Sequence, residues 1–154
     1  GTDASRTAIE LGMNNRLDTL QAAILLAKLP HLSTERHHRE RLAGRYDAQL
    51  ADLVETAPRD DGCDSAWALY TLRSPHREAI RQTLGDRRIA AAVYYHAPVH
   101  LHPAYLEFGD GPGSLPVSER LAGRVLSLPL TAEMSETQAD RVAEAVGEAL
   151  APST

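Results

Sequence analysis

Three histidines in one proline-containing loop are the side chains best suited to chemistry in this sequence. His96, His100 and His102 lie in the segment YYHAPVHLH, at spacings of four and two residues. Imidazole nitrogens bind metal ions and exchange protons near neutral pH. The loop could therefore hold a metal ion, face a substrate or form ordinary surface. Zinc is the weakest of these readings, because no fourth ligand or supporting carboxylate is evident from the sequence.

Two other residue types with reactive side chains are each present once. Lys28 is the only lysine, and it lies inside the apolar stretch LQAAILLAKL, where its stem would extend out of a packed face. Cys63 lies in the polar loop DDGCDS without a basic neighbour, which is typical of an unreactive loop cysteine. A single cysteine excludes an internal disulfide and fits a reducing compartment, so we expect a cytoplasmic protein.

Composition limits the classes of function. The 154 residues are 43% apolar and carry a net charge of −5. No basic stripe interleaved with aromatics is present, so we expect no nucleic-acid partner. No apolar run reaches the length of a membrane span, and the opening GTDASRT does not resemble a signal peptide, so we expect no membrane partner. Because the chain does not begin with Met, we expect it to be a piece of a longer protein.

The segment GMNNRLDTLQAAILLAKL, residues 12–29, joins a polar turn to a helix that is apolar almost all round. Asp18 followed by Gln21 predicts a capped helix that starts near Thr19. A helix without a polar face must be buried on all sides, and the rest of this chain is too small to cover it. We therefore predict a division into an interface turn and helix (1–30) and a small α/β domain (31–154).

The elements that must position the histidine loop follow in order. The patterns predict a second helix over 34–53, completing a helical hairpin, and then a three-stranded sheet with packed helices. The expected strands are 66–74, 88–96 and 126–130, and the expected helices are 76–86, 117–125 and 135–151, the last with a Ser135–Gln138 capping box. The predicted fold class is α/β, in an α+β-like small domain.

Five segments resemble the DegT/StrS family of pyridoxal-phosphate-dependent sugar aminotransferases when they are taken in order. They are GMNNRLDTLQAAILLAKLPHL, RERLAGRYDAQL, AWALYTLR, VYYHAPVHLHPAY and VLSLPLTAEMSETQADRV. The resemblance implies the C-terminal portion of a fold type I aminotransferase. Such an enzyme is a homodimer, and its N-terminal large domain carries the cofactor and the Schiff-base lysine.

The resemblance also assigns site residues. Asn14 matches a cofactor-phosphate ligand that reaches toward the neighbouring subunit, and Arg16 either binds the same anion or fixes the turn. Without the resemblance, turn geometry and a surface ion pair would explain both residues. Tyr95 and His100 match the loop that closes over the sugar-nucleotide substrate, with His100 the better candidate for contact. His96 and Asn15 depart from the family pattern, which leaves the identity of the sugar open.

The expected activity is transfer of an amino group from glutamate or glutamine to a keto-sugar nucleotide, in sugar-nucleotide or antibiotic biosynthesis. Lys28 does not match the family's catalytic lysine, so we assign no catalytic residue to this chain and expect it to be inactive alone. Two alternatives remain. The chain could be a non-catalytic dimerisation module that pairs through the apolar helix, or a small metal-binding domain built on the histidine loop.

Overall fold

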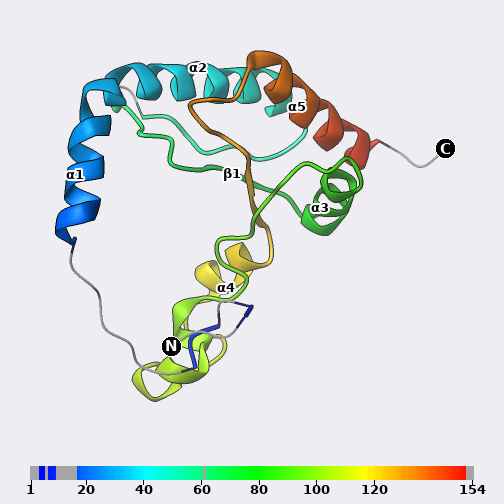
Figure 1. Ribbon diagram of the computed structural model, residues 1–154. Helices are drawn as coiled ribbons and strands as arrows, with labels where there is room; N and C mark the ends of the chain where they lie inside the picture. Colours follow the sequence, from blue (N-terminus) through cyan, green and yellow to red (C-terminus); the bar gives the residue numbers. More distant parts are fainter. Residues whose placement is uncertain (1–3, 6, 10–16, 61, 152–154) are drawn as a thin grey trace. The chain divides into compact units, whose positions relative to one another are not determined.

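The computed structural model describes residues 4–5, 7–9, 17–60 and 62–151, and it divides into two units (Figure 1). We call residues 1–29 and 95–123 the loop unit, and residues 30–94 and 124–154 the core unit. The domain division proposed from the sequence, at residue 30, stays a prediction. The sequence did not suggest that residues 95–123 would group with the N-terminal segment.

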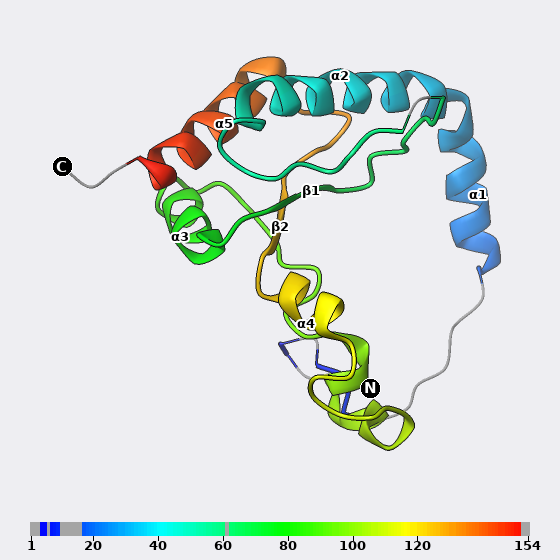
Figure 2. The same cartoon turned by 180° about the vertical axis from the view of Figure 1, so that it is seen from behind.

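The core unit is a two-stranded antiparallel sheet with three helices. Its elements are α2 (Leu32–Leu50), β1 (Tyr70–Arg73), α3 (Arg77–Asp86), β2 (Val125–Leu128) and α5 (Glu136–Leu150), and the short helix η1 (Leu29–His31) precedes α2. Tyr70 pairs with Leu128 and Arg73 with Val125. Figure 2 shows β1 and β2 together with α3 and α5, and α5 contacts both α2 and α3. The expected α/β small domain is confirmed.

The sheet differs from the expected three strands. Residues 88–96 reach β2 through one isolated bridge, in which Ala92 and Ser127 exchange backbone hydrogen bonds of 3.0 and 2.8 Å. A third strand would need several consecutive residues with backbone hydrogen bonds to β2. The segment therefore lies against β2 at a single bridge and does not form a third strand in the described part of the chain.

Apolar side chains at helical and strand spacing form the core of this unit. On α2 the buried residues Leu42, Tyr46 and Leu50 recur every fourth position, which is helical spacing. On α5, Val142 and Val146 are buried at the same spacing. The Tyr46 hydroxyl donates to the Pro129 carbonyl at 2.8 Å, which satisfies the one polar atom of that ring. Burial raises the pKa of this hydroxyl.

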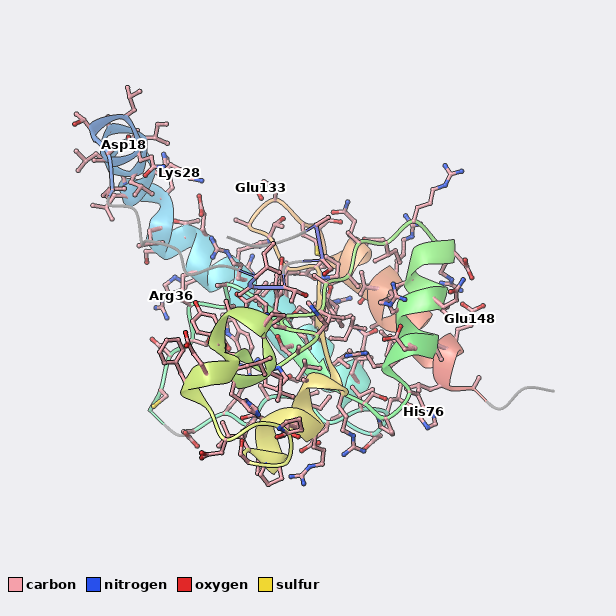
Figure 3. All side chains as sticks on the ribbon, turned by 90° about the horizontal axis from the view of Figure 1, so that it is seen from below. Asp18, Lys28, Arg36, His76, Glu133 and Glu148 are labelled. Carbon is pink, nitrogen blue, oxygen red and sulfur yellow. The ribbon has the colours of Figure 1, made fainter. Side chains whose placement is uncertain are left out.

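Local capping and ion pairs fix the ends of the helices. The Ser135–Gln138 capping box is confirmed, with bonds of 2.8 and 3.2 Å in the two directions. Arg45 on α2 donates two hydrogen bonds to Asp140 on α5, at 2.6 and 2.8 Å, and this pairing lowers the pKa of Asp140 to about 2. Figure 3 labels Glu148, near the end of α5, which pairs with Arg87 beyond the end of α3.

Helix α2 ends earlier than the sequence predicts. It ends at Leu50 and not at Leu53, because the next residues turn back and their N–H groups bond to the carbonyl of Leu50. On the same helix, His38 donates from Nε2 to the Met134 carbonyl at 2.7 Å. It thereby links α2 to the segment before α5.

The loop unit has short helices and almost no core. Its elements are α1 (Thr19–Lys28), η2 (Val99–Leu101), η3 (Pro103–Phe108) and α4 (Pro116–Ala122). α1 starts at Thr19 as predicted, because the Asp18 carboxylate accepts the Gln21 N–H at 2.8 Å. Figure 3 labels Asp18 and Lys28 at the two ends of this helix.

The apolar side chains of α1 are uncovered in this chain. No residue of α1 is buried, and Leu20 and Leu26 are 78% and 69% exposed. The sequence predicts that a larger body covers this helix, and this stays a prediction. None of the described helices has the length and apolar character needed to span a membrane.

Candidate functional site

The histidine loop is organised by a carboxylate that follows it in the chain. His100 lies in η2, where Pro98 precedes the turn and accepts the Leu101 N–H at 3.0 Å. The Nε2 atom of His100 lies 3.1 Å from a carboxylate oxygen of Glu119 on α4. Only 10% of the His100 side chain is exposed. The ring is therefore held in one orientation.

Glu119 binds the loop at several points. Its carboxylate accepts the Gly113 N–H at 2.9 and 3.0 Å and the Leu115 N–H at 3.2 Å. The backbone hydrogen bond from Gly113, followed by the contact with His100, lowers the pKa of Glu119. The carboxylate is thus charged at neutral pH, and it joins the two ends of the loop.

Two glycines make this arrangement sterically possible. Gly113 has a φ of +89°, a left-handed conformation that side chains rarely adopt, and its N–H points to Glu119. At Gly109, a Cβ atom would lie 3.3 Å from the Cβ of His100, which is closer than most such contacts. The backbone approaches His100 because this position has no side chain.

A carboxylate can only accept, so the Nε2 atom of His100 carries the hydrogen of that contact. Its Nδ1 atom makes no hydrogen bond within the described part of the chain. This ring nitrogen is therefore the one that can bind a substrate hydroxyl or exchange a proton. Glu119 orients the ring for that contact.

The two neighbouring histidines contact the N-terminal segment. His96 Nε2 lies 3.1 Å from the Thr7 hydroxyl, and His102 Nδ1 accepts the Ala8 N–H at 2.8 Å. His102 Nε2 lies 3.2 Å from the Ala97 carbonyl. The rings of His96 and His102 meet edge to face, with centroids 6.0 Å apart. His102 is 6% exposed, so it is buried in this contact.

The other predicted site residues fall in different environments. Tyr95, at the start of the loop, is 59% exposed. Asn14, Asn15 and Arg16 lie outside the described residues, so their assignments stay predictions. Lys28 is exposed at the end of α1.

The metal alternative finds no support in the geometry. Among the described residues, no group of three or more His, Cys, Asp or Glu side chains is placed to hold a metal ion. His102 has both ring nitrogens bonded to backbone groups, and His100 faces Glu119. The three histidines thus have separate partners.

Sequence reasoning missed Glu119, which lies 19 residues beyond His100. One available signal was the position of this acidic residue in the first turn of a helix that follows two glycines. The partner Ala8 carried no signal, since it contributes a backbone N–H, which almost every residue has.

Comparison with known proteins gives consistent results along the chain. The DegT/DnrJ/EryC1/StrS aminotransferase family matches residues 2–147. The erythromycin biosynthesis sensory transduction protein EryC1 of Saccharopolyspora erythraea is 45% identical over 136 residues, which cover 85% of this chain and 36% of that protein. The dTDP-3-amino-3,4,6-trideoxy-alpha-D-glucose transaminase of Streptomyces venezuelae is 41% identical over 142 residues, covering 89% and 37%.

Solved structures agree with these relatives. DesV of S. venezuelae superposes with a TM-score of 0.85 at 38% identity, covering 93% of this chain and 39% of DesV. A DegT DnrJ EryC1 StrS aminotransferase from Brucella abortus superposes with a TM-score of 0.81 at 40% identity, covering 91% and 38%. The chain spans little more than a third of the length of each relative named here.

Proposed function

This chain belongs to the DegT/DnrJ/EryC1/StrS aminotransferase family, and we propose that it is the C-terminal part of a pyridoxal-phosphate-dependent sugar aminotransferase. The whole protein would transfer an amino group from glutamate or glutamine to a keto-sugar nucleotide in the cytoplasm. The observation that carries this proposal is 41% identity over 142 residues to a sugar-nucleotide transaminase.

The donor chemistry of the Gly12–Arg16 segment fits a phosphate group. The Asn14 amide is a neutral N–H donor, and the Arg16 guanidinium is a charged fork of donors. We assign Asn14 to the phosphate of the cofactor, and Arg16 to the same anion or to the turn that presents Asn14. Pyridoxal phosphate, when bound, supplies the carbonyl chemistry that carries the amino group, and residues outside this chain would hold most of it.

His100 and Tyr95 are assigned to the sugar-nucleotide substrate. The Nδ1 atom of His100 has no hydrogen bond within the described residues, and Glu119 fixes the ring from the other side. The Nδ1 atom of such a ring can accept a hydrogen bond from a sugar hydroxyl without reorganisation. The exposed ring of Tyr95 offers an apolar face and a hydroxyl at the start of the same loop.

Helix α1 is assigned to an interface with the N-terminal large domain and the second subunit of a homodimer. Its exposed side chains Leu20, Ile24, Leu25, Leu26 and Leu29 would lie in water if the helix had no partner. Burial of such side chains contributes about 1.5–3 kcal/mol each relative to exposure. This favours a covered position in the whole protein.

The experiment is steady-state kinetics of the full-length protein with pyridoxal phosphate, glutamate and a series of keto-sugar nucleotides. His100→Ala is expected to raise KM for the sugar nucleotide at least about tenfold, because a hydrogen bond to the substrate is lost. His37→Ala, which changes an exposed histidine on α2, serves as the matched control.

A second variant tests the cofactor assignment. Asn14→Ala is expected to weaken pyridoxal phosphate binding by about tenfold, measured by absorbance titration, while Asn15→Ala has a smaller effect. A full-length protein that dimerises but shows no transamination with any keto-sugar nucleotide would favour the dimerisation module instead.

A further inference from the structure

The loop unit buries one side chain among its described residues, and that side chain is a histidine. His102 is 6% exposed, whereas every residue of the apolar core lies in the core unit. Buried polar groups are normally fully hydrogen-bonded, and both ring nitrogens of His102 have partners. A buried histidine in place of an apolar residue therefore requires an explanation.

The partners of His102 determine where its hydrogen lies. The Ala8 N–H can only donate, so Nδ1 of His102 is the acceptor of that 2.8 Å contact. The Ala97 carbonyl can only accept, so Nε2 carries the hydrogen at 3.2 Å. Together the two contacts specify the neutral Nε2–H tautomer.

These contacts join two segments that are far apart in the sequence. Ala8 is bonded on both sides, because its carbonyl also accepts the Ala104 N–H at 3.1 Å. Thr7 contacts His96 at 3.1 Å. The N-terminal segment leads into Gly12–Arg16, and the other segment carries His100. His102 thus links the segment that precedes the predicted phosphate ligands to the loop that carries the predicted substrate contact.

We propose that His102 is a positioning residue that, as the neutral Nε2–H tautomer, sets the N-terminal segment against the His100 loop. The structural link follows from the contacts above. Its consequence for catalysis rests on the proposed function.

The test uses the full-length protein and two variants of matched size. His102→Gln offers an amide oxygen to Ala8 and an amide N–H to Ala97 but cannot take up a proton, whereas His102→Leu removes both hydrogen bonds. Long-range proton–nitrogen NMR of labelled histidine reports the tautomer. Hydrogen exchange of the Ala8 amide, normalised to its intrinsic rate, reports the link at neutral pH.

The wild type is expected to show the Nε2–H tautomer, and its Ala8 amide is expected to exchange about tenfold more slowly than that of His102→Leu. His102→Gln is expected to keep this protection. Unchanged exchange of the Leu126 amide in the core unit shows that the fold is intact. An Nδ1–H tautomer, loss of Ala8 protection in His102→Gln, or wild-type protection in His102→Leu would overturn the proposal.

These measurements need no enzymatic turnover, so they decide the structural link even if transamination is absent. Where transamination is present, His102→Leu is expected to raise KM for the sugar nucleotide, and His102→Gln is expected to keep it near the wild-type value. A rise of the same size in both variants would contradict a positioning role. His37→Gln on α2 controls for loss of a histidine as such.

Discussion

The core unit and the loop unit are stabilised by different kinds of interaction. The core unit buries an apolar cluster that includes Leu42, Tyr46, Leu72 and Leu126, each with essentially no exposure. The loop unit buries only His102 among its described residues, and it is held by hydrogen bonds to Glu119 and to the N-terminal segment. Apolar burial gives stability without direction, whereas hydrogen bonds fix the orientation of particular groups.

This difference matches what each unit is proposed to do. The apolar core of the core unit contributes free energy of unfolding. The loop unit is proposed to present His100 and the Gly12–Arg16 segment to ligands, and this requires defined geometry. We therefore expect mutations in the two units to change different observables.

The largest effect is expected in the apolar core. Leu72→Ala removes a side chain with no exposure on β1, and we expect it to lower the free energy of unfolding by about 2–5 kcal/mol, as cavity-forming changes do. Urea unfolding measures this. Leu69→Ala, one residue before β1 and 46% exposed, is the matched control and should cost below about 1 kcal/mol. Equal losses for both variants would contradict the assigned core.

A large effect of another kind is expected at α1. Leu26→Glu places a charge on a side chain that is 69% exposed in this chain, so the isolated chain should lose little stability. In the full-length protein we expect the dimer dissociation constant to rise at least about tenfold, because a charge would enter an apolar interface. Analytical ultracentrifugation measures this, with Gln21→Glu on the same helix as control. An unchanged dimer dissociation constant would show that α1 lies outside the dimer interface.

Helix caps give an intermediate comparison between the units. Ser135→Ala breaks the capping box of α5, which packs on the core, and should cost about 1 kcal/mol of global stability. Asp18→Ala removes the matching bond at α1, and we expect local fraying with little change in global unfolding. Circular dichroism and urea unfolding separate the two outcomes. A global loss for Asp18→Ala would show that α1 is coupled to the core.

The smallest effect on global stability is expected at Glu119. The pKa of this carboxyl is lowered by the Gly113 N–H and His100, so its contribution to the loop is complete above the ordinary carboxyl pKa. It is lost as the pH falls through the lowered value. Glu119→Gln should therefore speed hydrogen exchange of Gly113 at neutral pH and converge with the wild type in acid. If Gly113 exchanged at the same rate in both proteins at neutral pH and at different rates in acid, the Glu119 carboxylate would not be charged in the folded loop.

Local patterns in the sequence predicted most of the elements. Asp18 started α1 at Thr19 and Ser135 capped α5, because a cap depends on residues three apart. The buried positions of α2 and α5 followed from the helical period. The end of α2 at Leu50 did not follow, since the residues to Leu53 continue the pattern while the chain turns.

The site was predicted less completely because its contacts are not local. The histidine loop was identified by composition, but the pairing of His100 with Glu119 depends on a turn built from Gly113. The contact of His102 with Ala8 joins residues 94 apart and uses a backbone group, which no sequence pattern marks. The roles of Asn14 and Arg16 stay predictions from family resemblance.

The cap at Asp18 has a kinetic consequence for assembly. α1 is already wound in this chain, with a side-chain bond at its first turn and a cation, Lys28, at its last turn, where positive charge suits the carbonyl end of a helix. A surface that is ordered before encounter spares the entropy of folding upon contact. Joining of the subunits would then be limited by collision and orientation and not by coil-to-helix conversion.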